Sequence, residues 1–133
     1  MSVINEVIEA VIGLMNALEP FATVTRGALP TGPGIVCEAG PSAPEAVFLD
    51  KNSYIPQDIT INAKHHDLQV LSAALGDIHS ALTRAKSYPS DPGGRWEIVD
   101  IVNYALPEII GREANNDWLM ASSLIVKFYW KGD

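Results

Sequence analysis

The chain has 133 residues, of which 47% are hydrophobic and 19% charged, and its formal net charge is −7. This length predicts a single domain, residues 1–133, that can enclose a hydrophobic core. The acidic balance and the lack of a basic run argue against binding nucleic acid by phosphate neutralisation, which needs clustered Lys and Arg.

The N-terminal segment, residues 2–18, is predicted to be an amphipathic helix that Ser2 can cap and that ends before Pro20. The residues of its apolar face are Ile4, Val7, Ile8, Val11, Leu14, Met15 and Leu18. Glu6 and Glu9 interrupt the apolar residues, so the segment does not resemble a secretory signal. No apolar run approaches the roughly 18 residues needed to cross a bilayer, and we expect a soluble chain made in the cytoplasm.

Four short strands are predicted before the second helix. They cover residues 21–26, 35–38, 46–49 and 58–64. The first two are expected to form a hairpin across residues 27–34, which are rich in glycine and proline. Residues 50–57 are expected to be irregular.

The fourth strand leads directly into the second helix, which reaches about Lys86. Its apolar stripe consists of Leu68, Leu71, Leu75, Ile78 and Leu82. Asp67 is a predicted N-cap, and Arg84 and Lys86 are placed in the last turn, where positive charge suits the helix dipole.

Two further strands are predicted in the C-terminal third, after a proline- and glycine-rich break at residues 87–94. Residues 95–104 are apolar on both sides, which favours a central strand or a face covered by a partner, although Asp100 does not fit this pattern. Residues 106–116 are expected to form a long connection. The last strand, residues 118–130, is unusually long and is expected to bend or to project beyond the sheet.

The predicted fold class is therefore α+β, with a mainly antiparallel sheet and two helices packed on one face. The predicted order of elements is α-β-β-β-β-α-β-β.

No residue pattern indicates catalysis, a metal site or a cofactor. His65 and His66 are expected to point to opposite sides of an extended chain, so they cannot easily share an ion. Cys37 lies in an apolar strand without a nearby base, which favours a buried, inert thiol. Gly93–Gly94 lacks the lysine of a phosphate loop. We therefore assign no catalytic, cofactor-binding or metal-ligating residue and expect no cofactor.

Several features instead favour a protein interface. Charged residues are scarcer than the usual quarter, which suggests that sister subunits cover part of the surface. Polar residues gather between Glu108 and Asn116, and tryptophan is a frequent anchor of protein interfaces. The interface candidates are Leu29, Trp96, Ile109, Ile110, Arg112, Glu113, Trp118, Tyr129 and Trp130.

The whole chain resembles the tail terminator, or tail completion, proteins of tailed phages and prophages of Gram-positive bacteria, whose genes are often labelled minor capsid protein. Three features carry the resemblance: the amphipathic helix at residues 2–18, the segment FLDKNSYIPQDITINAKHHDLQVLSAALGDIHSALTRAK, and the ending NNDWLMASSLIVKFYWKGD. It rests on pattern and not on a diagnostic motif.

The resemblance implies a non-enzymatic subunit of a homo-oligomeric, commonly hexameric ring in the virion. Such a ring caps the tail tube, contacts the tail-tube protein and the head connector, and lets DNA pass through its lumen without specific binding. Residues 27–34, 87–94 and 106–116 would then be candidate contacts between subunits or along the axis.

Other functions fit the same sequence. A head-completion or stopper protein of the connector has a similar composition. A small α+β ligand-binding domain or enzyme, or a prophage or toxin-system regulator that binds a protein, is a further alternative.

Overall fold

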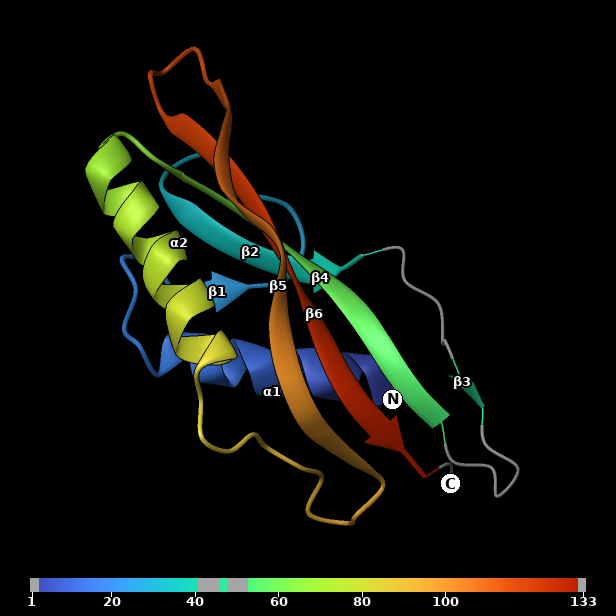
Figure 1. Ribbon diagram of the computed structural model, residues 1–133. Coiled ribbons are helices and arrows are strands. Elements are labelled where there is room, and N and C mark those ends of the chain that lie inside the picture. Colours follow the sequence, from blue (N-terminus) through green and yellow to red (C-terminus); the bar gives the residue numbers. More distant parts are fainter. Residues whose placement is uncertain (1–2, 41–45, 48–52, 132–133) are drawn as a thin grey trace.

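The computed structural model describes residues 3–40, 46–47 and 53–131. Its elements are α1 (Val3–Asn16), β1 (Val24–Thr25), β2 (Gly34–Ala39), β3 (Ala46–Val47), β4 (Ser53–His65), α2 (Leu68–Thr83), β5 (Trp96–Arg112) and β6 (Trp118–Trp130). This order confirms the predicted one, and Figure 1 shows the arrangement. The Ser2 cap, the end of the third predicted strand and the start of the predicted irregular segment 50–57 lie outside the described residues.

The strands form one mostly antiparallel sheet in the order β1-β2-β4-β6-β5, with β3 paired to one end of β4. The two long strands β4 and β6 pair along their whole lengths, from Ser53 opposite Trp130 to His65 opposite Trp118. The sheet is mixed because β1 and β2 are parallel, with Val24 opposite Ile35.

The predicted hairpin between residues 21–26 and 35–38 is therefore wrong. The chain after Thr25 travels back past the start of β1 before β2 begins, so the two strands run in the same direction. The described part of residues 50–57 is not irregular but belongs to β4, because alternate side chains such as Ile55 and Gln57 are buried under the helices.

The predictions for the C-terminal hairpin are confirmed only in part. Of the two alternatives expected for strand β6, a bend or a projection beyond the sheet, the pairing excludes the projection, since β4 flanks β6 on one side and β5 on the other. Strand β5 is an edge strand and not a central one. It continues to Arg112, so most of the predicted connection at residues 106–116 is strand.

Both helices cover one face of the sheet and share one hydrophobic core with it. The stripe of α2 is buried as predicted at Leu71, Leu75, Ile78 and Leu82. The Asp67 carboxylate caps the helix by accepting from the amides of Gln69 (2.9 Å) and Val70 (3.3 Å). The strand residues of the core include Ile35, Cys37, Ile59, Ile61, Ile98, Ile101, Leu124, Val126 and Phe128.

The ends of both helices were predicted less well. Helix α2 ends at Thr83, so Arg84 is its C-cap and Lys86 lies outside it. Leu18 does not join the core face of α1, because the helix ends at Asn16 and Leu18 is 41% exposed. Neither helix in the described ranges has both the length and the hydropathy of a membrane-spanning segment.

Candidate assembly surface

Strand β5 is irregular along the open edge of the sheet. It uses 17 residues to pair with the 13 residues of β6, and its register shifts at four places. Each shift leaves an extra β5 residue without a direct partner, as in a β-bulge. The extra residues are Val99, Tyr104, one of the pair Leu106 and Pro107, and Ile110.

Most of the apolar side chains that β5 exposes lie at these bulges. Tyr104 is 66% exposed, Leu106 65% and Ile110 54%, and the neighbouring Ile109 is 50% exposed. Of the eight exposed large hydrophobic side chains in the described residues, five lie on β5, the fifth being Val99. Such a concentration on one edge is typical of a binding surface rather than of ordinary scattered exposure.

The same bulges determine how this edge can be used. A regular edge strand offers an unbroken row of amides to an incoming strand, whereas β5 interrupts that row four times and includes Pro107, which has no amide hydrogen. A partner would therefore contact the apolar side chains of β5 instead of extending the sheet.

The first bulge also explains the misfit of Asp100. Because Val99 is extra, Ile98 and Ile101 both face the helices, opposite Phe128 and Val126. Asp100 is placed on the outer face, opposite Lys127. The sequence alternation alone could not reveal this change of phase.

The tip of the β5–β6 hairpin is attached to the end of β4. The Lys64 ammonium lies 2.9 Å from Oε1 of Glu113, and the Lys64 side chain is only 5% exposed. The Arg112 guanidinium lies 4.3 Å from the centroid of the Trp118 ring, and its Nε donates to the Asn116 carbonyl. Figure 1 shows this tip rising beyond the end of α2.

A hollow of about 470 Å³ lies beside the tip. It is lined by residues 29–31 together with Lys64 and residues 113–115. Leu29 and Glu113 are both interface candidates predicted from the sequence. They are far apart along the chain, and the fold brings them together at this hollow.

The interface candidates divide between the two ends of the hairpin. Leu29, Ile109, Ile110, Arg112, Glu113 and Trp118 lie toward the tip, and Trp96, Tyr129 and Trp130 lie at the opposite end. Trp96 is 6% exposed and belongs to the core, whereas Tyr129 is exposed and its ring lies 5.3 Å from that of Tyr54. Trp118 and Trp130 are partly buried against the core. Tyr104 and Leu106 were not among the candidates, because the irregular edge that exposes them leaves no sequence signal.

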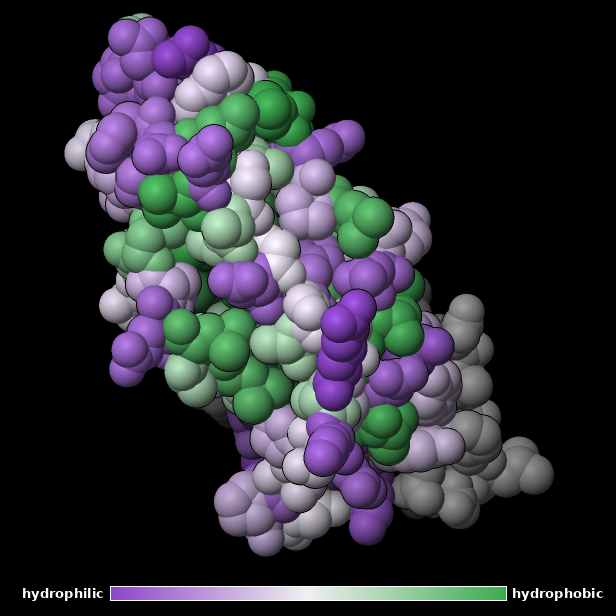
Figure 2. Space-filling view, turned by 60° about the vertical axis from the view of Figure 1, so that its left-hand side comes forward, coloured by the Kyte–Doolittle hydropathy of each residue, from purple (hydrophilic) through white to green (hydrophobic). Residues whose placement is uncertain are grey.

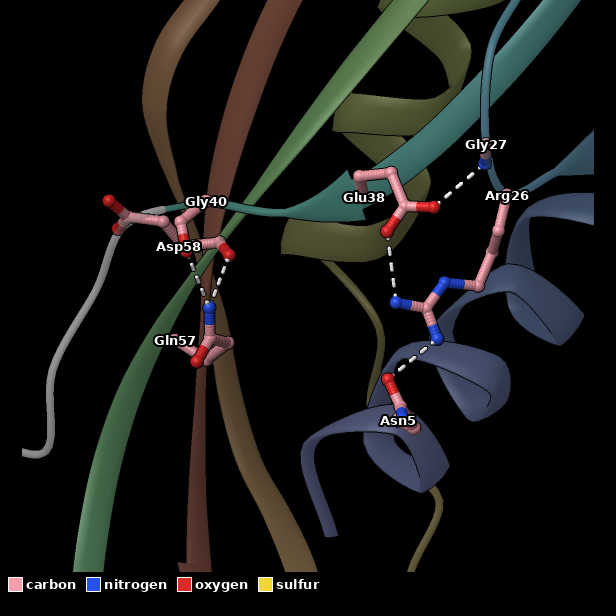
Figure 3. Close-up of polar contacts among 7 residues, drawn as sticks. All are labelled: Asn5, Arg26, Gly27, Glu38, Gly40, Gln57 and Asp58. Carbon is pink, nitrogen blue, oxygen red and sulfur yellow. Dashed lines mark hydrogen bonds and ion pairs between the residues drawn. The ribbon is translucent and has the colours of Figure 1, made fainter. Parts of the chain in front are cut away.

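Two polar clusters hold β2 in place (Figure 3). The Glu38 carboxylate accepts from Arg26 (2.9 Å) and from the amide of Gly27 (2.7 Å), and Arg26 also donates to Asn5 of α1. Its hydrogen bond to Arg26 lowers the pKa of Glu38. Beyond the end of β2, the buried amide of Gln57 donates to the carbonyls of Gly40 and Asp58. These contacts connect β2 to the end of β1, to α1 and to β4.

The candidate chemical residues do not converge. Cys37 is fully buried, and burial raises the pKa of its thiol to about 12, which disfavours the thiolate needed of a nucleophile. His65 and His66 do not point apart as predicted but stack with ring centroids 4.4 Å apart. The strand alternation ends there, because His65 Nδ1 accepts from the Asp67 amide as the chain turns into α2. No group of three metal-ligating side chains occurs among the described residues.

Comparisons with known proteins show the fold. No known family model matches the sequence, and no curated protein matches it. A chain from the virion of a native gene transfer agent particle matches the structure with a TM-score of 0.63 and 14% sequence identity. The match covers 97% of this chain and 99% of the other, so the two chains share their fold over nearly their full matched lengths.

Proposed function

We propose that this chain is a structural, non-enzymatic subunit of a phage-type virion. The observation that carries the proposal is the structural match to a virion chain, which extends over nearly the full length of both proteins. The match includes both helices and the sheet, because it covers 97% of this chain and 99% of the other. The sequence resemblance to small phage tail proteins supports the same role.

Within such a particle, the proposed role is that of a tail terminator. Copies of the chain would form a ring, with six as the expected number, that caps the tail tube and joins it to the head connector. A ring subunit meets two neighbours through two different surfaces. The apolar row on β5, with Tyr104, Leu106, Ile109 and Ile110 all at least half exposed, supports the presence of such a surface.

The acidic charge supports the same assignment. A formal net charge of −7 repels the phosphates of DNA, so a ring of these subunits would let DNA pass without retaining it. We place the assembled protein at the junction of head and tail, after assembly in the host cytoplasm.

Native mass spectrometry tests the ring directly. The purified 14.4 kDa chain, alone or mixed with tail tubes, is expected to give a closed oligomer. A strain that lacks the gene is expected to make tails of abnormal length. Monomers under every condition, together with normal tails in the deletion strain, would rule out the terminator.

Electron microscopy of isolated heads and tails separates the terminator from the stopper. A terminator is expected at the head-proximal end of tails that were made without heads. A head-completion or stopper protein is instead expected on heads that were made without tails.

A further inference from the structure

A second apolar surface lies on the other side of α2 from strand β5. It is a groove of about 310 Å³ between the end of α1 and the outer flank of α2. Its lining is apolar at Leu18, Pro20, Phe21, Val70, Ala73, Ala74 and Ile78, and two carboxylates, Glu19 and Asp77, stand beside it. Figure 2, which brings this side of the molecule forward, shows several separate groups of hydrophobic side chains below the hydrophilic hairpin tip.

We propose that this groove receives the Ile109–Ile110 segment of β5 from a neighbouring copy of the chain. The inference rests on the proposed ring and assigns its subunit contact. It identifies the two surfaces that the ring needs as the bulged edge of β5 and the α1–α2 groove.

The β5 edge and the α1–α2 groove lie on different sides of α2, so the Ile109–Ile110 segment cannot enter the groove of its own subunit. Ser72 bonds to Met120 of β6 and His79 bonds to Asn103 of β5, so this flank of α2 faces the C-terminal hairpin. Val70, Ala74 and Asp77, spaced by four and three residues, lie on the opposite flank and line the groove. The β5 edge and the groove therefore face in different directions.

Surfaces that face apart in one molecule make a head-to-tail contact between molecules. Such a contact leaves one free groove and one free edge on every pair, so subunits continue to add until the ring closes. The protruding hairpin suits this role, because its tip rises beyond the end of α2 (Figure 1) and can reach a neighbour.

Charge complementarity favours this occupant. Arg112, two residues from Ile110, is exposed and has no ion-pair partner among the described residues. Glu19 and Asp77 likewise have no ion-pair partner within the described part of the chain. An apolar segment that ends in a cation thus matches an apolar groove flanked by anions. By contrast, Arg26, Lys64 and Arg95 are already paired with carboxylates of their own chain.

Disulfide trapping between two variants, each with one added cysteine beside the native Cys37, tests the contact. Ala73→Cys places a thiol in the groove and Ile110→Cys places one on β5, while Cys37 stays unreactive because it is fully buried. Mild oxidation of the mixture is expected to link the two variants. The matched control mixes Ala73→Cys with Glu97→Cys, an exposed residue at the far end of β5, and is expected to give at least about fivefold less cross-link.

Charge reversal tests the same contact by another route. Arg112→Glu is expected to weaken association by at least about fivefold, and Asp77→Arg added in the neighbouring copy is expected to restore it. Circular dichroism should show both variants folded, since each change is on the surface.

The outcomes separate this inference from the ring itself. Rings that persist in Ile110→Asp, with a cross-link no stronger than the control, would overturn the contact and leave the ring standing. Rings that persist in Ile110→Asp but no longer bind tail tubes would show that the tube protein occupies this surface, which also overturns the inference. A strictly monomeric wild-type chain would overturn both.

Discussion

At the scale of single residues, His79 links α2 to β5 at the bulged edge. It is only 4% exposed, and its Nδ1 lies 2.8 Å from Oδ1 of Asn103. The amide oxygen can only accept, so Nδ1 carries the hydrogen and Nε2 is left as a bare acceptor. The Nε2 atom has no hydrogen-bond partner among the described residues. A second proton there would create a buried cation and a buried unsatisfied donor.

This arrangement predicts a pH-dependent stability. Burial lowers the pKa of His79 below its ordinary value of 6.5. Below about pH 6.5 the unfolded chain therefore binds more protons at this residue than the folded chain, and the free energy of unfolding falls as the pH falls toward the folded pKa. Above pH 6.5 the full contribution is present. Urea unfolding between pH 5 and 8 measures the slope.

His79→Gln is the matched variant, because its amide can still donate to Asn103 but does not titrate. Its free energy of unfolding is expected to change less between pH 6.5 and 5 than that of the wild type. His65 and His66 remain in both proteins, so the difference reports His79 alone. Equal slopes in the two proteins would show that His79 does not titrate differently on folding.

At the scale of elements, the apolar stripe of α2 packs in the core that the sheet shares with α1. Leu75 is fully buried at its centre, and the core around it contains residues of both helices and of five strands. Leu75→Ala is expected to lower the free energy of unfolding by about 2–5 kcal/mol, because it removes apolar contacts and leaves a cavity. Gln69→Ala, an exposed change on the same helix, is expected to stay within about 0.5 kcal/mol of the wild type. Thermal or urea denaturation measures both, and similar values for the two would mean that α2 is not part of the core.

The same scale shows what the sequence could predict. The apolar stripe of Leu71, Leu75, Ile78 and Leu82 and the Asp67 cap depend on local chemistry, and both are confirmed. The predicted bounds of the last strand are confirmed as well. The parallel pairing of β1 with β2 depends on contacts between distant segments, which spacing does not encode. Each bulge of β5 shifts the alternation of its side chains by one residue. The sequence therefore predicts a strand at residues 95–104 and a connection at residues 106–116, where the structure has one strand to Arg112.

The exposed surface on β5 was predicted only in part, because the bulges that shape it are not visible in the sequence pattern. Ile109 and Ile110 were chosen as apolar residues among charged ones, and the structure places them on an open edge. Tyr104 and Leu106 are more exposed still, at 66% and 65%, but the bulges that accompany their exposure cannot be located from the sequence pattern. The groove on α2 could not be predicted, because it depends on where the end of α1 rests.

At the scale of the whole molecule, the placement of charge limits what the chain can bind. Among the described basic side chains, Arg26, Lys64 and Arg95 are paired with carboxylates of the same chain, and Arg112 lies over Trp118. The formal net charge is −7, and Glu97, Asp100 and Glu108 lie along the exposed edge strand. Such an acidic surface repels the phosphates of DNA whatever the DNA sequence.

This distribution predicts that the protein does not retain DNA, even where salt screening is weakest. Electrophoretic mobility of a short duplex in about 50 mM salt is expected to be unchanged by the protein, because binding to DNA requires the release of counterions by clustered cations. Replacing Glu97, Asp100 and Glu108 together by lysine raises the net charge and gives the matched variant, which is expected to shift the duplex and to lose it as salt increases. A shift by the wild-type protein that disappears with salt would mean that its cations act together, and a ring of such subunits would hold DNA in its lumen instead of letting it pass.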